Sequence, residues 1–170
     1  PMLFPFFFFI IPIFSSIILL TSSVLPSAPI PSELGFSLPV TQTISSYDTH
    51  GFHGDGISCD VYDFSSTPMP AQITSWSPFP PDDTVQALLY GWTEENAQEI
   101  TSIGPFLTDD NGDPLVPKIT NGYYLLIDRQ EETTTPLLSR PSLNFTLAVY
   151  DSDKDTLYYC KMDTWTIRQK

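Results

Sequence analysis

Positive charge is scarce in this sequence. Its 170 residues include 7 Lys and Arg against 20 Asp and Glu, which gives a formal net charge of −13 at pH 7. A surface this acidic repels phosphate backbones and has no electrostatic attraction to anionic membranes. No charged residue precedes Glu33, so the whole net charge belongs to the chain from that point on. The composition therefore argues against nucleic acid as a partner.

Recognisable catalytic and metal-binding motifs are also missing. There is no Gly-x-Ser-x-Gly elbow, no Gly-rich phosphate loop and no Cys/His zinc spacing. The only two histidines, His50 and His53, lie in a Gly-rich run that we interpret as a flexible loop and not as a metal site. The Asp151–Asp155 segment resembles the first half of a calcium loop. Thr156 and Met162 stand where that loop needs Gly and Glu, so we interpret the segment as a hairpin turn. We predict no enzymatic activity, no metal and no cofactor.

The chain begins with a long apolar run, from Met2 to Leu20, which small residues follow. An apolar core before small residues is typical of a secretory signal. The run is just long enough to span a membrane, but Pro5, Pro12 and the lack of a basic stop-transfer residue favour a cleaved signal. We assign residues 1–23 to a signal peptide. The protein is then expected outside the cell or in a vacuolar or lysosomal lumen.

Residues 24–53 are rich in Pro, Ser and Thr and have no periodic apolar pattern, so we interpret them as a disordered leader or propeptide. The folded domain is expected over residues 54–170. It contains the only two cysteines, Cys59 and Cys160, which an exported chain would pair as a disulfide. The alternative is two free buried thiols.

From residue 57 onward, short apolar or alternating segments are separated by turn residues every 8–12 positions or so, a spacing typical of an all-β sandwich or barrel. We predict an all-β fold: a two-sheet, immunoglobulin-like β-sandwich with one disulfide. The expected strands are Ile57–Asp63, Ala71–Ser77, Thr84–Trp92, Gln98–Ile103, Gly122–Arg129, Leu143–Tyr150 and Thr156–Ile167.

Alternation along three of these strands predicts which side chains face the interior. One inward-facing set comes from each strand: Val85, Ala87 and Leu89; Tyr123, Leu125 and Ile127; Phe145, Leu147 and Val149. The same strand region holds the only N-glycosylation sequon, Asn144-Phe145-Thr146, which is used only if Asn144 faces solvent.

Several of these pieces resemble the ML lipid-recognition family, and in particular its fungal phosphatidylglycerol/phosphatidylinositol transfer proteins. The shared pieces are an early cysteine, a strand running into a Ser-Pro-x-Pro-Pro turn, a strand ending in Gly, and a final strand, acidic turn and strand that carries the last cysteine. Here they read Cys59, Ile73–Pro81, Ala87–Gly91 and Phe145–Cys160. The resemblance implies a secreted two-sheet sandwich that holds a lipid between its sheets, with its first and last cysteines paired.

The chain also departs from that family pattern. Val116 stands where a cysteine of the internal disulfide would be, the segment between Ile103 and Val116 is short, and Arg140-Pro141-Ser142 replaces a Pro-Gly. Strands of the shortened segment help to wall the lipid pocket in the family.

Two functions follow from this sequence. The first is a monomeric lipid-binding or lipid-transfer protein that carries a phospholipid or sterol to a membrane or protein acceptor. Its pocket would be lined by the nine inward-facing residues given above, each of which ordinary core packing would explain equally well. The second is a secreted, effector-like interaction protein with a filled core and no lipid. An exposed aromatic patch from Trp76, Phe79 and Trp92 would favour it.

Overall fold

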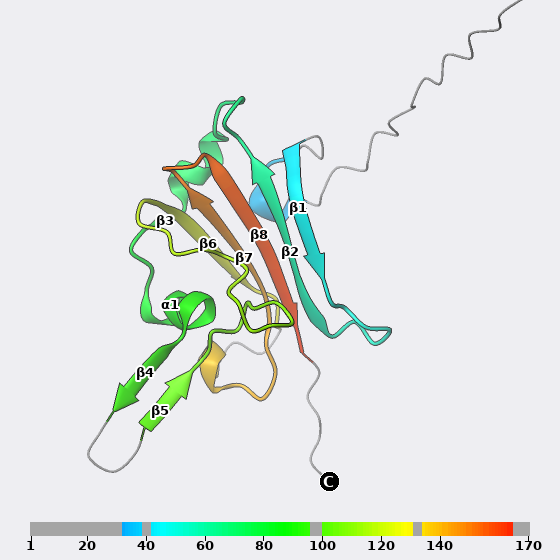
Figure 1. Cartoon of the computed structure of the whole chain (residues 1–170), viewed down its shortest axis with the longest axis vertical. Coiled ribbons are helices and arrows are strands. Elements are labelled where there is room, and N and C mark those ends of the chain that lie inside the picture. The colour runs from blue at the N-terminus through cyan, green and yellow to red at the C-terminus, as the bar shows by residue number, and fades with distance from the viewer. Residues whose placement is uncertain (1–31, 39–41, 96–99, 131–133, 165–170) are drawn as a thin grey trace, which may run out of the picture.

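A computed structural model describes residues 32–38, 42–95, 100–130 and 134–164. It is mostly β, as predicted, and it contains one disulfide. Six strands form one antiparallel sheet in the order β1-β2-β8-β7-β6-β3, and β4 and β5 form a separate two-stranded hairpin (Figure 1). The strands are β1 (Thr43–Asp48), β2 (Gly56–Asp63), β3 (Ser77–Pro78), β4 (Trp92–Glu95), β5 (Ile100–Ile103), β6 (Gly122–Asp128), β7 (Asn144–Asp151) and β8 (Thr156–Asp163).

Four helical elements complete the described fold. They are the α-helix α1 (Asp83–Tyr90) and the 3₁₀ turns η1 (Ser32–Leu34), η3 (Ala71–Ser75) and η4 (Leu137–Ser139). No helix among the described residues is long and apolar enough to cross a membrane.

The centre of the sheet is the β7–β8 hairpin, which the sequence predicts well. Asp151–Asp155 forms its turn, and Asp155 adopts a left-handed conformation with φ of 48°. The Tyr150 hydroxyl donates a hydrogen bond to the Asp155 carboxylate at 2.8 Å, and Asn121 donates to Asp153 at 3.0 Å. The expected strands at Ile57–Asp63, Gly122–Arg129 and Leu143–Tyr150 are confirmed to within a residue or two at each end.

Most of the segment Thr84–Trp92 is a helix, α1, and Trp92 already belongs to β4, so the single strand predicted there is wrong. Asp82 caps the helix, because its carboxylate accepts a hydrogen bond from the Val85 N–H at 2.9 Å, and Gly91 ends it with φ of 69°. Val85, Leu88 and Leu89 are buried at the i, i+3, i+4 spacing of a helix face. Val85, Ala87 and Leu89 do alternate in the sequence. Leu88 is equally buried, however, and a strand with alternating faces would not bury it on the same side.

The segment Ala71–Ser77 is not a strand either. It forms the 3₁₀ turn η3, in which Ile73 is buried, and Trp76 is buried three positions later. This period of three suits a 3₁₀ turn and not the two-residue period of a strand. Only Ser77 and Pro78 pair with β6, at the far edge of the sheet. Of the last predicted strand, Thr156–Ile167, the described part pairs as far as Asp163.

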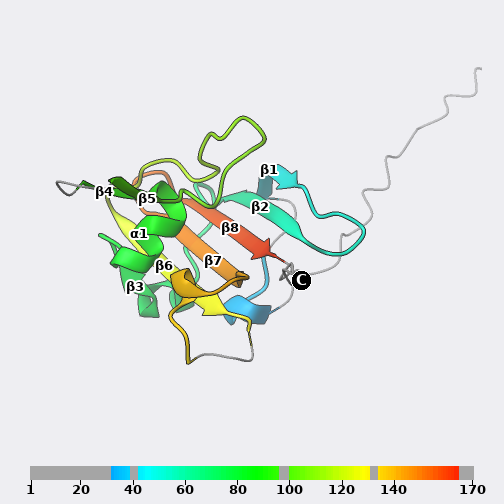
Figure 2. The same cartoon turned by 90° about the horizontal axis from the view of Figure 1, so that it is seen from below.

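The sheet separates two apolar clusters. On one face, α1 and the long loop after β5 pack against the strands; Figure 2 shows that loop arching over this side of the sheet. On the other face lie η1 and η3, with Leu34 and Leu38 buried at 4% and 2% exposure against the strands. Among the described residues, helix and loop therefore cover the two faces of the large sheet.

Residues of the expected leader take part in this core. Besides Leu34 and Leu38, Glu33 accepts hydrogen bonds from Thr146 at 2.9 Å and from Lys161 at 3.3 Å. Burial raises the pKa of Glu33, but the hydrogen bonds from Thr146, Lys161 and Tyr159 outweigh burial and lower it below its ordinary value.

A second part of the expected leader is also ordered, because Thr43–Asp48 forms the edge strand β1. The described part of residues 24–53 thus differs from the expectation of a disordered leader, whereas its removal in the mature protein stays a prediction.

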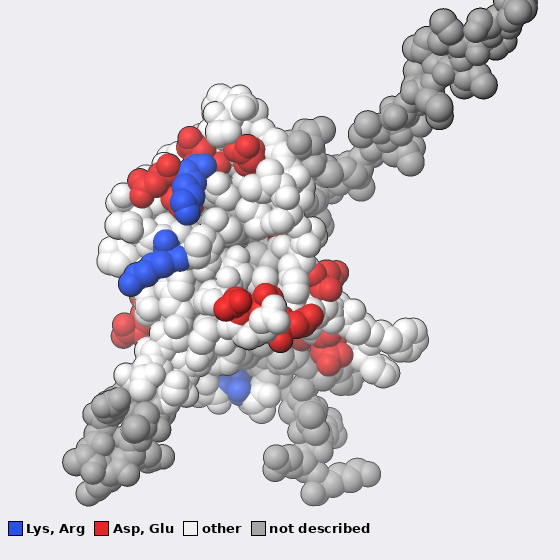
Figure 3. Space-filling model, viewed as in Figure 1, with Lys and Arg blue, Asp and Glu red and all other residues white. Residues whose placement is uncertain are grey.

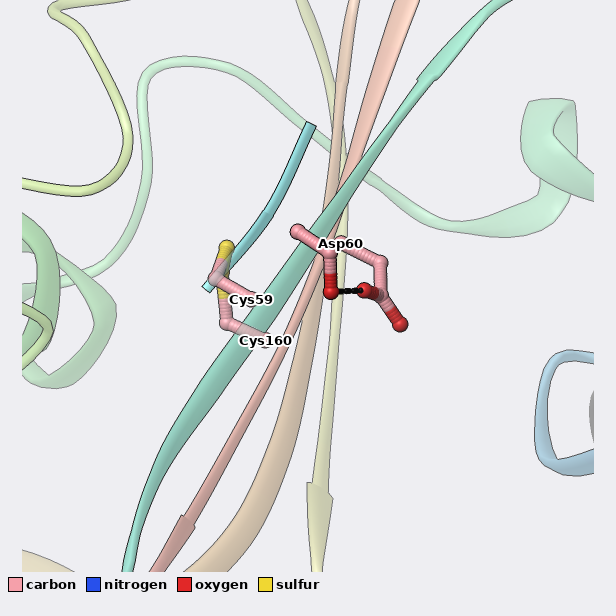
Figure 4. The surroundings of a disulfide bond; sticks show 4 residues. Cys59, Asp60 and Cys160 are labelled. Carbon is pink, nitrogen blue, oxygen red and sulfur yellow. Dashed lines mark hydrogen bonds between the residues drawn. A yellow bond between two sulfur atoms is a disulfide. The ribbon is translucent and has the colours of Figure 1, made fainter. Parts of the chain in front are cut away.

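The disulfide joins neighbouring strands of the large sheet. Cys59 on β2 is directly paired with Cys160 on β8, and their Cα atoms are 3.9 Å apart. Figure 4 shows the disulfide on one side of the β2 ribbon and Asp60 on the other, as alternation along a strand requires. Both cysteines are buried in the cluster that α1 covers. The predicted pairing is confirmed.

Candidate interaction surface

The nine residues expected to line a lipid pocket do not share one side of the sheet. Val85 and Leu89 on α1 pack in one cluster with Phe145, Leu147 and Val149 of β7. Tyr123, Leu125 and Ile127 of β6 pack in the other cluster, across the sheet. The register explains this division, because β6 places Tyr124 and Leu126 opposite Val149 and Leu147. The sheet itself therefore separates the β6 residues from the rest of the set.

The candidate lining side chains of α1 and β7 leave no open space beside them. Val85, Ala87, Leu89, Phe145, Leu147 and Val149 all have 0% exposure. A chamber wide enough for an alkyl chain would leave its lining side chains facing a void at least as wide as a water molecule. These six side chains face no such void, so they form an ordinary close-packed core.

The expected aromatic patch is dispersed as well. Trp76 is 7% exposed and stacks on Phe36 at a centroid distance of 6.2 Å. Phe79 is partly buried and meets Tyr124 edge-on at 5.9 Å. Trp92 instead lines a surface hollow of about 450 Å³ with Leu138, Asp83, Thr84 and Gln86. Proline-rich connections carry Trp76 and Phe79 into the core, where the sequence alone suggested exposed loops.

The two edges of the large sheet differ. At one edge, β3 has two residues, and its Pro78 lacks a backbone donor, which limits further strand pairing. At the other edge, β1 has six residues and no proline, glycine or lysine. It pairs with β2 on its inner side, and no described residue hydrogen-bonds to the backbone on its outer side. Its Ile44 is 62% exposed. An open edge of this kind offers unpaired N–H and C=O groups to another chain.

Carboxylates surround this open edge. On one face of β1, the Ser46 hydroxyl donates to Asp60 of β2 at 2.5 Å. On the other face, the Tyr47 hydroxyl donates to Asp110 at 3.0 Å and so ties the 108–114 loop to the strand. Residues 42–63 contain four Asp, residues 108–114 contain three, and neither segment has a Lys or Arg. Figure 3 shows acidic side chains over this loop and around the β1–β2 hairpin. We call β1 with these two segments the acidic edge.

His50 is the one titratable side chain in the β1–β2 loop that bridges distant elements. Its Nδ1 lies 2.7 Å from Asp48 and its Nε2 lies 3.3 Å from Asp163, which in turn accepts a hydrogen bond from Arg129 at 2.9 Å. The backbone and side-chain hydrogen bonds from His50 lower the pKa of Asp48. These contacts anchor the loop to the end of β8. No sequence pattern predicts the contact between His50 and Asp163, because it joins residues 113 positions apart. The described residues contain no group of three His, Cys, Asp or Glu arranged to hold a metal ion.

Asn144, the sequon residue, is the first residue of β7 and is half-buried. Its Oδ1 accepts a hydrogen bond from the Thr164 N–H at 3.1 Å. Thr146, by contrast, has 0% exposure. Asn144 therefore lies at the rim of the fold, whereas Thr146 lies in the core.

No protein-family model matches the chain, and neither a curated protein nor a solved structure matches it. The resemblance to the ML family stays a prediction.

Proposed function

We propose that the chain is an exported binding protein that recognises an extended, positively charged segment of another protein at the acidic edge. The observation that carries this proposal is the open outer side of β1 among seven carboxylates, with no Lys or Arg in the two segments that form the surface. An extended segment can add to such an edge through main-chain hydrogen bonds, while its alternate side chains meet the residues on either face.

The negative charge of the acidic edge determines which kind of segment binds there. Lysine or arginine side chains on an added strand would lie close to Asp48, Asp60 and Asp110 on the two faces of β1. Electrostatic complementarity of this kind speeds encounter and rejects partners of like charge. A second copy of this chain is disfavoured for the same reason, because each copy carries a net charge of −13.

Lipid binding stays a prediction of the sequence. It would require the hollow two-sheet sandwich of the ML family, whereas the described core packs a helix against a sheet, and six of the nine candidate lining residues face no void. Native mass spectrometry of the full exported chain, followed by organic extraction, decides between the two functions. We expect protein without lipid. A reproducible co-purifying phospholipid or sterol would overturn the filled-core interpretation.

The binding proposal is tested with a defined probe. An octapeptide of alternating lysine and valine should bind the full exported chain and shift the backbone NMR signals of β1, and its affinity should fall as salt rises. An octapeptide of alternating glutamate and valine is the control peptide of opposite charge and should not bind. Equal affinity for both peptides, or signal shifts confined to residues outside the acidic edge, would contradict the proposal.

Position 44 offers the matched pair of variants. Ile44 is 62% exposed, so neither variant is expected to alter folding. Ile44→Lys places a positive charge on the edge and should weaken binding of the lysine peptide by about tenfold, which corresponds to about 1.4 kcal/mol. Ile44→Thr keeps a β-branched, neutral side chain and should bind nearly as the wild type does.

A further inference from the structure

We propose that Asn144 carries an N-linked glycan and that the hollow beside it holds the first N-acetylglucosamine of that glycan. The sequon Asn144-Phe145-Thr146 is the only one in the chain. This inference does not depend on the acidic edge, because β1 and β7 are separated by β2 and β8 in the sheet.

The amide of Asn144 is fixed in an orientation that suits attachment. Its Oδ1 is engaged by the Thr164 N–H at 3.1 Å, and its backbone carbonyl accepts from the Arg129 N–H at 2.8 Å. The remaining amide atom, Nδ2, is the atom to which the sugar is joined. Nδ2 is not among the buried polar atoms that lack a partner, and no described residue hydrogen-bonds to it. The hydrogen bond to Oδ1 therefore presents Nδ2 at the rim.

A hollow of about 510 Å³ lies at this position, with Asn144 in its wall. Its volume falls within the range of small-molecule sites, about 300–1,000 Å³. The other described residues of the wall are Arg129, Gln130, Thr135, Arg140, Pro141 and Ser142, most of which have polar side chains. Hydroxyl and acetamide groups of a sugar match such a wall, because each can both donate and accept hydrogen bonds.

The wall is held in place by its own hydrogen bonds. Gln130 Nε2 donates to the Ser142 carbonyl at 2.9 Å, and its Oε1 accepts from Arg140 at 3.1 Å. Arg140 also forms an ion pair with Asp128 at 2.7 Å, and hydrogen bonding from Arg140 lowers the pKa of that carboxyl. Arg129 Nε is buried beside this wall without a hydrogen-bond partner. A preformed wall of this kind loses little freedom when a sugar packs against it.

The buried end of the sequon indicates when the glycan is added. Thr146 has 0% exposure, and its hydroxyl is committed to Glu33 at 2.9 Å. An enzyme that must contact both Asn144 and Thr146 cannot reach the threonine in the folded chain. Attachment therefore precedes folding, and the sheet then closes with the first sugar lying in the hollow.

The test begins with the full chain secreted from a eukaryotic cell. Intact-mass spectrometry should show added mass that peptide-N-glycosidase F removes from the denatured protein while converting Asn144 to aspartate. Asn144→Asp should lack this mass, and Thr146→Ser should keep it, because serine preserves the sequon and the buried hydroxyl. Secreted wild-type protein with no added mass on Asn144 would overturn the proposal.

A second measurement tests the hollow itself. An endoglycosidase that cuts between the first two sugars should act slowly on the native protein and rapidly after denaturation. Ser142→Trp fills the hollow and should make the native protein as sensitive as the denatured one. Ser139→Trp places the same side chain at an exposed position outside the hollow wall and should leave the protection intact. Equal cleavage of native and denatured wild type would show that the glycan projects into solvent and would overturn the second half of the proposal.

Discussion

Two tyrosines buried in the same apolar cluster differ in what their hydroxyls contact. Tyr150 on β7 donates to Asp155 at 2.8 Å, whereas the Tyr62 hydroxyl on β2 is buried without a hydrogen-bond partner. The Thr43 side chain is near enough to affect the pKa of Tyr62 but does not meet hydrogen-bond geometry. Burial raises the pKa of Tyr62 to about 12. A buried hydroxyl without a partner costs free energy that a paired one does not.

Replacing each tyrosine with phenylalanine should therefore have opposite effects. Tyr62→Phe removes an unpaired hydroxyl and should raise the free energy of unfolding by about 1 kcal/mol, whereas Tyr150→Phe breaks a hydrogen bond to a carboxylate and should lower it by about 1.5 kcal/mol. Chemical denaturation of both variants at one pH is the measurement. Each variant is the control for the other, since both lose one buried oxygen from the same cluster. A loss of stability in Tyr62→Phe comparable to that in Tyr150→Phe would contradict the assignment.

At the scale of elements, the N-terminal segment belongs to the folded unit. It contributes Leu34 and Leu38 to the core, Glu33 to a polar contact with β7 and β8, and β1 to the sheet. Burial of a leucine side chain stabilises by roughly 1.5–3 kcal/mol, so the two leucines alone represent a large share of the stability of a small domain.

Two truncations should separate these roles. A chain that begins at residue 32 retains all of these contacts and should unfold cooperatively, with stability near that of the longer chain. A chain that begins at residue 54 loses both leucines and β1, and we expect it to be largely unfolded or aggregated, because β2 then becomes the sheet edge. Circular dichroism and thermal unfolding of the two proteins make the comparison. Equal stability of the two chains would mean that the N-terminal segment does not contribute to the core.

The strands and helices differ in how well sequence patterns predict them. The β6, β7 and β8 strands could be predicted because alternation and turn chemistry agree there, as at the Asp151–Asp155 turn. Helix α1 was missed because Val85, Ala87 and Leu89 satisfy a two-residue period; the signals that could have found it are the cap residue Asp82 and the terminating Gly91. Strand β1 was missed for a different reason. It is an edge strand with few buried side chains, so it has no apolar alternation to detect.

The candidate site was less predictable than the strands. The acidic composition is plain in the sequence, but the gathering of carboxylates on the acidic edge depends on the contact between Tyr47 and Asp110, which are 63 positions apart. The hollow at Asn144 likewise needs the 129–130 and 140–142 segments side by side. Sequence patterns describe faces of single elements, whereas sheet edges and hollows arise from how elements meet.

For the molecule as a whole, the disulfide closes most of the domain. Cys59 and Cys160 are 101 positions apart, and they join the strands that link β1 to the centre of the sheet. In the chain-entropy model, a cross-link over a loop of this length stabilises the folded state by about 4.7 kcal/mol, chiefly by restricting the unfolded chain. A small domain has a total stability of only about 5–15 kcal/mol.

Loss of this disulfide should therefore lower the free energy of unfolding of the whole domain. The double variant Cys59→Ala, Cys160→Ala should lose about 3–5 kcal/mol of unfolding free energy in denaturant titrations. Part of that loss comes from packing, since both cysteines are buried. Reduction of the wild type keeps both sulfur atoms in the core and isolates the effect of the cross-link. If the reduced wild type is as stable as the oxidised protein while the alanine variant is not, packing and not chain entropy is the contribution of these cysteines. If both lose stability together, the cross-link itself stabilises the folded domain, including β2, on which β1 pairs.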